Sequence, residues 1–293
     1  RTSCPVLNTF LIFEALSVLT RKHKGTQAMP WIETTINREV RAARATLKPY
    51  GFSTLLAPPD SNPKIAKGLA QGVMTAPLHL APADLSGWNV CPMATLGCKA
   101  ACLHTAGNPA AMAGKDRARK ARTRAFFEQR AAFMVTLANE IHNLNTKARK
   151  AGMICAVRLN ATSDIRWERE PVTLGGVTYA NMMQLFSDVV FYDYTKIANR
   201  RNVPSNYKLT FSLAENNDAH ASVAFNQGFN VAVVFDVKRG KPLPDTFTIC
   251  DKAYRVIDCD ESDARFADPR GVVIGLRAKG KAIGDTSGFV RAA

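Results

Sequence analysis

Three of the seven cysteines in this chain fall within twelve residues, at Cys91, Cys98 and Cys102, in a C-x6-C-x3-C pattern. Pro92 and Gly97 lie between them and allow a loop over residues 89–104 to curl. Thiolates gathered this closely are typical ligands of a soft metal ion or an iron–sulfur cluster. The sequence therefore predicts a metal or cluster site on this loop, and the rest of the chain must fold around it.

The number of ligands bears on the identity of the metal. Three thiolates suit a [4Fe-4S] cluster whose fourth iron stays open for a substrate or S-adenosylmethionine, whereas structural zinc requires four closed ligands. Buried cysteines that bind nothing are a third interpretation. A fourth ligand, if there is one, has four candidates in the sequence: His104, Cys155, Cys250 and Cys259.

Composition indicates a basic globular protein. Hydrophobic residues make up 46% of the chain, and the formal net charge is +15 with a pI near 9.7. Such a charge predicts nucleic acid or a phosphorylated substrate as partner. An odd number of scattered cysteines argues against a secreted disulfide framework, so we expect a reducing cytoplasm and no membrane association.

The chain divides into three parts. Residues 1–28 resemble an upstream extension, because the sequence opens on Arg1, Met29 could be a natural start, and the apolar run 5–19 is too short and polar to span a bilayer. Residues 29–72 form an N-terminal helical and loop segment. Residues 73–293 form a single α/β core domain.

Helical periodicity appears at 30–48 and again over 114–150, where we expect a break near 123–127. Six of the ten residues 115–124 are basic. Arg117, Lys120 and Arg124 share one helix face with a spacing that can follow a phosphate backbone, although a merely solvated face has the same pattern.

Short apolar runs alternate with helical or polar segments in the second half of the chain. This alternation predicts a parallel α/β barrel or partial barrel with a helical N-terminal extension. The expected strands are 73–80, 153–159, 189–192, 209–211, 231–235 and 272–276.

Polar residues follow several of these strands, at the position where parallel sheets place active sites. We expect six of them to shape a catalytic pocket: Asn160, Ser163, Asp164, Asp193, Tyr194 and Lys196. Lys279 and Lys281, between glycines, suit anion contact. An acidic run could bind magnesium or could be a solvated loop: Asp258, Asp260, Glu261 and Asp263.

Several stretches resemble the gene product 88 family of tailed phages and plasmids. They are Asn62-Pro63-Lys64 with Lys67, Leu80-Ala81-Pro82-Ala83, Ser86-Gly87, Asn89-Val90-Cys91-Pro92, Gly97-Cys98, Cys102-Leu103, Ala106-Gly107, Arg158-Leu159-Asn160, Thr162-Ser163-Asp164, Phe191-Tyr192-Asp193-Tyr194-Thr195-Lys196 and Gly288-Phe289-Val290. The resemblance implies a phage or mobile-element origin in a bacterial host and no particular activity. A more distant likeness is to radical S-adenosylmethionine enzymes, from whose C-x3-C-x2-C spacing this chain departs.

Three hypotheses follow. The first is an iron–sulfur protein with radical S-adenosylmethionine-like chemistry on a nucleic acid or phosphorylated substrate. The second is a non-catalytic nucleic-acid-binding protein in which zinc is a structural staple. The third is a metal-dependent nuclease that uses the acidic run near Asp258.

Overall fold

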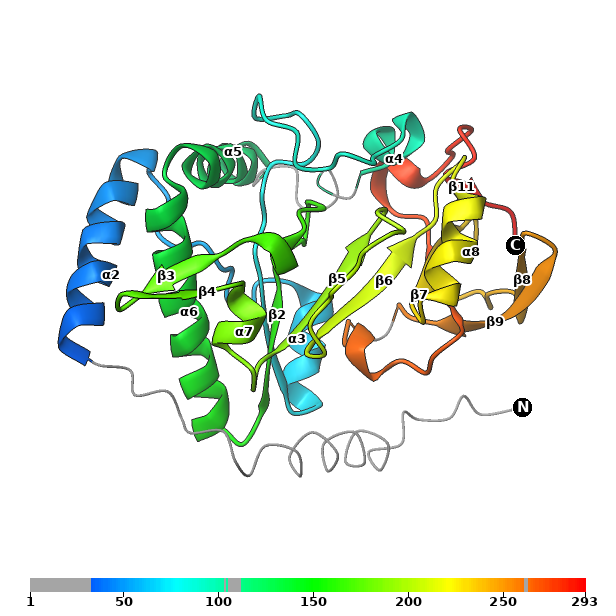
Figure 1. Ribbon diagram of the computed structural model, residues 1–293. Coiled ribbons are helices and arrows are strands. Elements are labelled where there is room, and N and C mark those ends of the chain that lie inside the picture. The colour runs from blue at the N-terminus through cyan, green and yellow to red at the C-terminus, as the bar shows by residue number, and fades with distance from the viewer. Residues whose placement is uncertain (1–32, 103, 105–111, 261–262) are drawn as a thin grey trace.

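The computed structural model describes residues 33–102, 104, 112–260 and 263–293. It shows a mixed α/β fold around a nine-stranded, mostly parallel central sheet (Figure 1). Six parallel strands follow one another across the sheet in chain order: β1 (Val73–Pro77), β2 (Ile154–Arg158), β5 (Val190–Thr195), β6 (Tyr207–Ser212), β7 (Asn230–Phe235) and β10 (Val273–Arg277). Each expected strand is therefore confirmed, with ends that shift by at most three residues.

The strands beyond β10, and the short strand β11, were not expected from the sequence. β9 (Lys252–Asp258) runs parallel to β10, and β8 (Thr246–Ile249) pairs antiparallel with β9. β11 (Val290–Arg291) pairs with the end of β7, on the part of that strand beyond its contact with β6. A separate hairpin is formed by β3 (Val172–Leu174) and β4 (Val177–Tyr179).

The helices follow the predicted periodicity. α2 (Glu33–Leu47) packs against α6 (Arg130–Lys150), and the long helical region breaks at Gln129, two residues beyond the expected range, so that α5 (Met112–Glu128) precedes α6. Shorter helices are α3 (Pro63–Ala70), α4 (Leu96–Ala100), α7 (Met182–Leu185) and α8 (Asp218–Asn226). None of the helices in the described part of the chain combines the length and apolar character needed to cross a bilayer.

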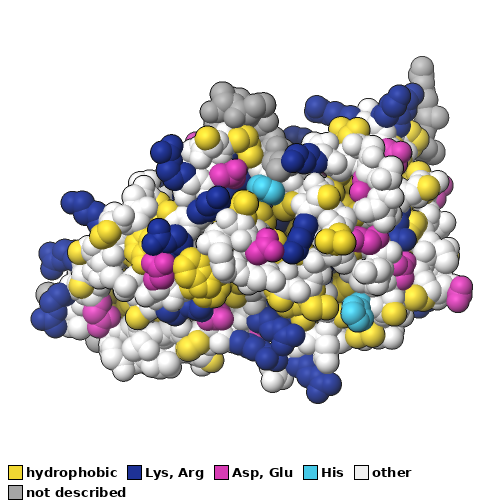
Figure 2. Space-filling view, turned by 90° about the horizontal axis from the view of Figure 1, so that it is seen from above, with side chains coloured by type: hydrophobic (Ala, Val, Ile, Leu, Met, Phe, Trp, Pro, Cys, Tyr) yellow, Lys and Arg dark blue, Asp and Glu magenta, His cyan; other side chains and the backbone are white. Residues whose placement is uncertain are grey.

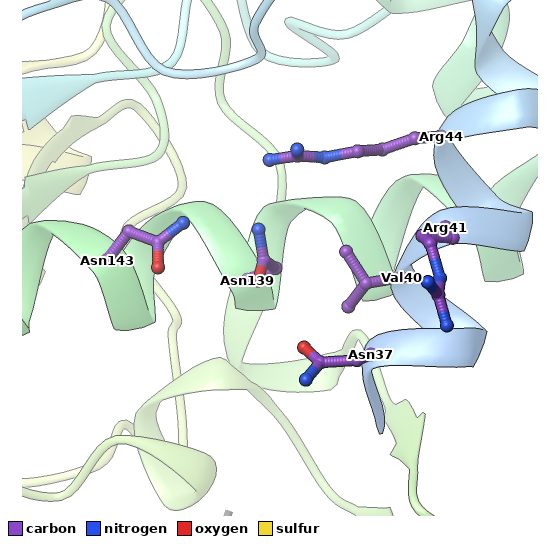
Figure 3. A pocket seen from close by; sticks show the side chains of 6 residues that line it. All are labelled: Asn37, Val40, Arg41, Arg44, Asn139 and Asn143. Atoms are coloured by element: carbon purple, nitrogen blue, oxygen red, sulfur yellow. The ribbon is translucent and has the colours of Figure 1, made fainter. Parts of the chain in front are cut away.

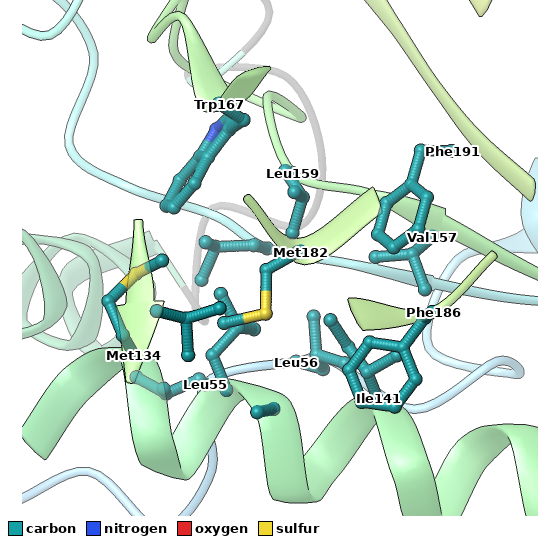
Figure 4. Packing of buried hydrophobic residues seen from close by; sticks show 14 of the residues in the cluster. Leu55, Leu56, Met134, Ile141, Val157, Leu159, Trp167, Met182, Phe186 and Phe191 are labelled. Carbon is teal, nitrogen blue, oxygen red and sulfur yellow. The ribbon is translucent and has the colours of Figure 1, made fainter. Parts of the chain in front are cut away.

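The largest hydrophobic core lies between the helical layer and one face of β1, β2 and β5. Figure 4 shows Met134 and Ile141 of α6 facing Val157 and Phe191 of the sheet. Trp167 is fully buried in this core and lies against Phe126 of α5. Burial of one such aromatic or branched side chain stabilises the fold by about 1.5–3 kcal/mol, so this layer holds the sheet rigid beneath the loops at its carboxyl edge.

Candidate functional site

The cysteine loop lies across the carboxyl edge of the sheet. The backbone N–H of Asp164, which follows β2, donates a 2.8 Å hydrogen bond to the carbonyl of Val90. Glu215, which follows β6, accepts hydrogen bonds from Gly97 N–H and the Thr95 hydroxyl at 2.8 and 2.7 Å. The loop thus reaches from β2 to β6, over the edge where parallel sheets bind ligands.

A short helix carries the middle cysteine. Thr95 caps α4 by accepting a 3.1 Å hydrogen bond from the Cys98 N–H, as N-cap threonines do. A Cβ atom on Gly97 would lie 2.2 Å from Ser287 Oγ and 2.9 Å from the Glu215 carboxylate. Glycine is therefore required here, because the helix packs directly on Glu215 and on the C-terminal segment.

The three thiols lie within electrostatic range of one another. Burial raises the pKa of Cys91 to about 12, and the neighbouring Asp164, Cys102 and Cys98 raise it further, although the Ala83 N–H donates to its Sγ at 3.3 Å. Burial also raises the pKa of Cys102, partly offset by the His104 N–H and by Arg119 and Lys196. Without a metal, the Cys91 thiol is protonated at neutral pH.

The sulfur atoms do not form a closed ligand set in this arrangement. Among the described residues, no three Cys, His, Asp or Glu side chains lie close enough together to hold a metal ion. The other candidate ligands lie on different elements: Cys155 in the core face of β2, Cys250 in the β8–β9 turn, and Cys259 just after β9. His104 is two residues from Cys102, with its Nδ1 buried.

Three of the six predicted pocket residues, Asn160, Ser163 and Asp193, form a buried polar network. Asn160 Oδ1 accepts hydrogen bonds from Ser163 Oγ, Ile165 N–H and Trp167 Nε1 at 2.8 to 3.0 Å. Asp193 accepts from the Asn160 N–H at 2.8 Å and from the Tyr207 hydroxyl at 2.9 Å. These bonds fix the turn after β2, so Asn160 and Asp193 support the site from beneath it.

Asp193 has a perturbed pKa. Its carboxylate is fully buried, and burial raises its pKa to about 7, against the opposing effects of Arg158 and the hydrogen bonds from Asn160 and Tyr207. Asp164 belongs to a second set of buried contacts: it accepts a 2.8 Å hydrogen bond from the Lys196 N–H, and its carboxylate lies 3.6 Å from the Arg200 guanidinium. Arg200 in turn pairs with the buried Glu168.

The side chains of Lys196 and Tyr194 lie outside the network around Asn160 and Asp193. Lys196 is 8% exposed, and its Nζ donates to Ser212 Oγ at 2.7 Å and lies 5.3 Å from the Phe289 ring centre. Asp164 raises the pKa of the Cys91 thiol, and Lys196 lowers that of the Cys102 thiol. Tyr194 is half-buried on the other face of β5 from Asp193, with the Arg158 guanidinium 5.4 Å from its ring.

The acidic run is neutralised by cations. Arg277 binds Asp258 at 2.7 Å and Asp260 at 3.0 Å, and Lys279 also pairs with Asp260. Asp263 binds Arg158 at 2.9 Å. Glu261 lies outside the described residues. Carboxylates committed to arginine and lysine are poor magnesium ligands, which removes the main support for the nuclease hypothesis.

The predicted basic face lies at the edge of the molecule that carries the cysteine loop. Arg117, Lys120 and Arg124 are exposed on α5, and Arg124 pairs with Glu128. Lys279 and Lys281 are also exposed. Figure 2 shows many Lys and Arg side chains spread over the face that carries α4 and α5, with Asp and Glu side chains among them.

A separate groove of about 400 Å³ lies between α2 and α6 (Figure 3). Apart from Val40, its lining residues are asparagines and arginines: Asn37, Val40, Arg41, Arg44, Asn139 and Asn143. None of these residues belongs to the cysteine loop or to the predicted pocket, so the groove is not part of the candidate site.

Sequence reasoning missed the residues that hold the loop in place. Glu215 was visible as a polar residue after a strand, but nothing in the sequence pairs it with Gly97, 118 residues away. Arg200 and Glu168 were missed for the same reason, since their pairing spans 32 residues. A buried charged residue can be recognised from the sequence only when its partner lies next to it in the chain.

Comparison with known proteins gives a family match. The model of the family described as gene product 88 matches residues 54–293, which include the cysteine loop, the polar network and the C-terminal segment. No curated protein and no solved structure matches. The distant likeness to radical S-adenosylmethionine enzymes thus has no support from these comparisons. α2 and most of its groove lie outside the matched residues.

Proposed function

Because the chain belongs to the gene product 88 family over residues 54–293, which contain all three clustered cysteines, we propose that it is a phage or mobile-element iron–sulfur protein. Cys91, Cys98 and Cys102 are the proposed ligands of a [4Fe-4S] cluster. The observation that carries the proposal is the placement of three thiols, each half-buried and within electrostatic range of another, on one loop at the carboxyl edge of a parallel sheet.

The donor set fits a cluster chemically. Thiolates are the ligands that iron–sulfur clusters use, and cations near a thiol favour its ionised form. Arg119 and Lys196 act in this way on Cys102. Binding requires the three sulfur atoms to come closer than they lie here. The proposal therefore needs the segments on either side of the five-residue α4 to move, because α4 holds Cys98 while Cys91 and Cys102 flank it.

The sheet topology supports a finer interpretation, a partial barrel. The six main parallel strands follow one another in chain order, without the reversal of order that marks a doubly wound sheet. The cysteine loop follows β1, the first of them. A site at the mouth of such a barrel would be shaped by Asp164 and Lys196, with Asn160, Ser163, Asp193 and Tyr194 around and beneath them.

In this proposal Cys91, Cys98 and Cys102 would hold the cluster, which would supply the electron for reductive cleavage of a bound S-adenosylmethionine. The protein's residues would orient the cosubstrate and keep water away. Incubation of the reconstituted protein with dithionite and S-adenosylmethionine tests this step. The proposal expects 5′-deoxyadenosine from the wild type and none from Cys98→Ala. Equal amounts from both proteins would contradict it.

Ligation itself is tested by comparing two cysteine variants. Cys98→Ala should lose the cluster, because two remaining thiolates cannot hold it in place. Cys250 is exposed in the β8–β9 turn, far along the sheet from the loop, so Cys250→Ala is the matched control and should keep the wild-type iron and sulfide content. If Cys98→Ala retains the cluster, the ligand assignment is wrong.

A second candidate function rests on the exposed basic face of α5. Arg117 and Lys120 make no ion pair with any described residue and are open to solvent, as phosphate-contacting side chains are. In this alternative the chain binds nucleic acid without catalysis, and the cysteines hold a structural zinc ion. The measurement that separates it from the first is metal analysis, since zinc and iron cannot both occupy the site.

A further inference from the structure

Two hollows lie along the seam between α2 and α6. The first is the groove of about 400 Å³ shown in Figure 3, and the second, of about 480 Å³, continues past the end of α2. Arg44 lines both, and Figure 3 shows its side chain extending from α2 toward Asn139 of α6. The two hollows therefore form one path, which we call the seam groove.

One face of each helix supplies the walls of the seam groove. On α2, Asn37, Arg41 and Arg44 recur at spacings of four and three residues, which places them on one side of the helix. On α6, Asn139 and Asn143 recur at a spacing of four and line the opposite wall. Guanidinium groups donate hydrogen bonds, and amides both donate and accept them, so these walls are suited to a polar ligand.

The cations of the seam groove are not paired off by protein carboxylates. Arg41, Arg44 and Lys48 are exposed, and none forms an ion pair within the part of the chain that the structure describes. Glu140 lines the second hollow, but its carboxylate accepts the backbone N–H groups of residues 55 and 56 at 3.0 and 2.8 Å. Burial raises the pKa of Glu140 and Arg44 lowers it, so one carboxylate partly compensates one of the three cations.

The second hollow also holds an unpaired hydroxyl. Thr136 lines it and is 4% exposed, and its Oγ1 has no hydrogen-bond partner among the described residues. A helical threonine usually bonds to a carbonyl of the preceding turn, and this one does not. Buried polar atoms without a partner are rare in folded proteins. The Thr136 hydroxyl is therefore available to a molecule bound in the hollow.

Aromatic rings lie where the seam groove meets α5. Phe52 lines the second hollow and is half-buried, and the Arg122 guanidinium lies 6.0 Å from its ring centre. Tyr50 lies beside it, with 6.4 Å between the ring centres and Arg124 5.8 Å away. The Tyr50 hydroxyl donates to Glu128 at 2.7 Å, which fixes this ring. Aromatic rings beside arginines are the platforms on which proteins stack unpaired bases.

We propose that the seam groove binds single-stranded nucleic acid, with phosphates along its three cations and one base stacked on Phe52. Residues 37–47 of α2 extend about 15 Å at 1.5 Å per residue, a length that holds about four stacked nucleotides at 3.4 Å each. A duplex hides the faces of its bases, so it cannot use the ring of Phe52. An acidic peptide would pair with the cations but leave the ring unused.

This site goes beyond the proposed iron–sulfur function and does not depend on it. It also differs from the exposed face of α5, because it combines cations with a hollow, an aromatic ring and an unpaired hydroxyl. α2 precedes residue 54, at which the family match begins, so most of the seam groove lies outside the matched residues. A failure of cluster binding would leave this inference standing.

Fluorescence anisotropy of a labelled oligothymidylate of about 15 nucleotides, with the whole chain, tests the inference. The double substitution Arg41→Gln and Arg44→Gln should reduce the slope of log K against log salt by about 1.4, at about 0.7 per phosphate of a single strand. Arg38→Gln with Lys150→Gln is the matched control, since both residues are exposed and line neither hollow. The control should keep the wild-type slope.

Two further variants separate loss of contact from misfolding. Phe52→Leu keeps an apolar side chain but removes the stacking face, so it should weaken binding about fivefold or more and leave the salt slope unchanged. Thr136→Val removes the unpaired hydroxyl and should weaken binding about two- to tenfold. Its melting temperature should stay the same or rise, because an unsatisfied buried group is gone.

Four results would overturn the inference. They are equal slopes for the groove and control variants, duplex binding as tight as single-strand binding, displacement of the oligonucleotide by polyglutamate at equal charge concentration, and no binding by the wild type at low salt. A loss of binding confined to Arg117→Gln with Lys120→Gln would likewise overturn it, and would place the contact on the exposed face of α5.

Discussion

Glu215 accepts a 2.8 Å hydrogen bond from the backbone N–H of Gly97, and so joins the turn after β6 to the helix that carries Cys98. Burial opposes ionisation of Glu215, but hydrogen bonds from Thr95 and Gly97 and the nearby Lys196 hold its pKa below the usual range. An ionised carboxylate at this position fixes the start of α4. The Glu215 side chain thus anchors the cysteine loop to the β6 end of the sheet.

Gly97→Ala tests this anchor. The new methyl group would collide with Ser287 Oγ and the Glu215 carboxylate, so we expect a loss of about 1–3 kcal/mol in unfolding free energy, as in other overpacked sites, together with a lower metal content. Gly114→Ala, in α5, meets no atom within 4 Å and is the control. It should be neutral or stabilising by up to about 1 kcal/mol. Equal effects of the two substitutions would contradict the packing described for α4.

The stability of the protein should depend on His79 in acid. Its pKa is about 3 in the folded chain and near 6.5 when unfolded. The unfolded chain therefore binds more protons between these values, so the contribution of neutral His79 is complete above pH 6.5 and is lost as the pH falls toward 3.

His79→Gln should flatten this part of the pH profile. By about pH 5 the wild type should have lost up to about 2 kcal/mol more than the variant, relative to pH 7, at about 1.4 kcal/mol per pH unit. Urea denaturation of both proteins at several pH values measures the difference. Parallel profiles would show that His79 titrates normally.

The thiols of the metal-free protein should differ in reactivity. Cys91, whose pKa is raised to about 12 by burial, is almost entirely protonated at pH 8, with a thiolate fraction of about 10⁻⁴. Cys250 is exposed. Brief treatment with N-ethylmaleimide, followed by peptide mass spectrometry, should label Cys250 long before Cys91. Comparable labelling rates would show that Cys91 is more accessible or more acidic than its surroundings imply.

Nucleic-acid binding through the outer face of α5 predicts a change in salt dependence. Each neutralised phosphate contributes about −0.9 to the slope of log K against log salt on duplex DNA. The double substitution Arg117→Gln and Lys120→Gln should therefore reduce the slope by about 1.8. Lys147 and Lys150 are exposed near the far end of α6, and their double substitution to Gln is the control for net charge. Equal slopes for both double variants would exclude α5 as the contact surface.

The main parallel strands could be predicted from the sequence because they are buried on both faces and appear as short apolar runs. β7, for example, is the run Asn230–Phe235 with four fully or nearly buried positions. The break between α5 and α6 was also predicted, although Gln129 lies slightly beyond the expected range. A strand that is buried along its whole length is apolar along its whole length, so it can be recognised without knowing which strands lie beside it.

The β8–β9 hairpin could not be predicted in this way. Both strands have largely exposed or half-exposed side chains. The two residues that turn the chain, Cys250 and Asp251, have φ angles of 46° and 63°, in the left-handed region where Asn-Gly or Asp-Gly is the usual signal. The dipeptide Cys250-Asp251 does not predict such a turn.

The residues predicted to shape a pocket do lie at or just after strand ends, but the role of each one depends on which way its side chain faces. Asn160 and Asp193 occupy the expected positions, yet the Asn160 side chain binds the turn after β2, and the Asp193 carboxylate accepts a hydrogen bond from the Asn160 backbone N–H. Lys196, three residues beyond Asp193, reaches Ser212 and influences Cys102. The position of a residue after a strand predicts that it lies at the edge of the sheet, whereas its contacts across the sheet decide its role.

The central claim is that the three clustered cysteines hold an iron–sulfur cluster. It is tested most directly by the ultraviolet–visible spectrum of protein purified without oxygen, with iron, sulfide and zinc measured on the same sample. The account predicts a broad band near ~400 nm and about four irons and four sulfides per chain. Stoichiometric zinc without colour, or no metal at all, would contradict it.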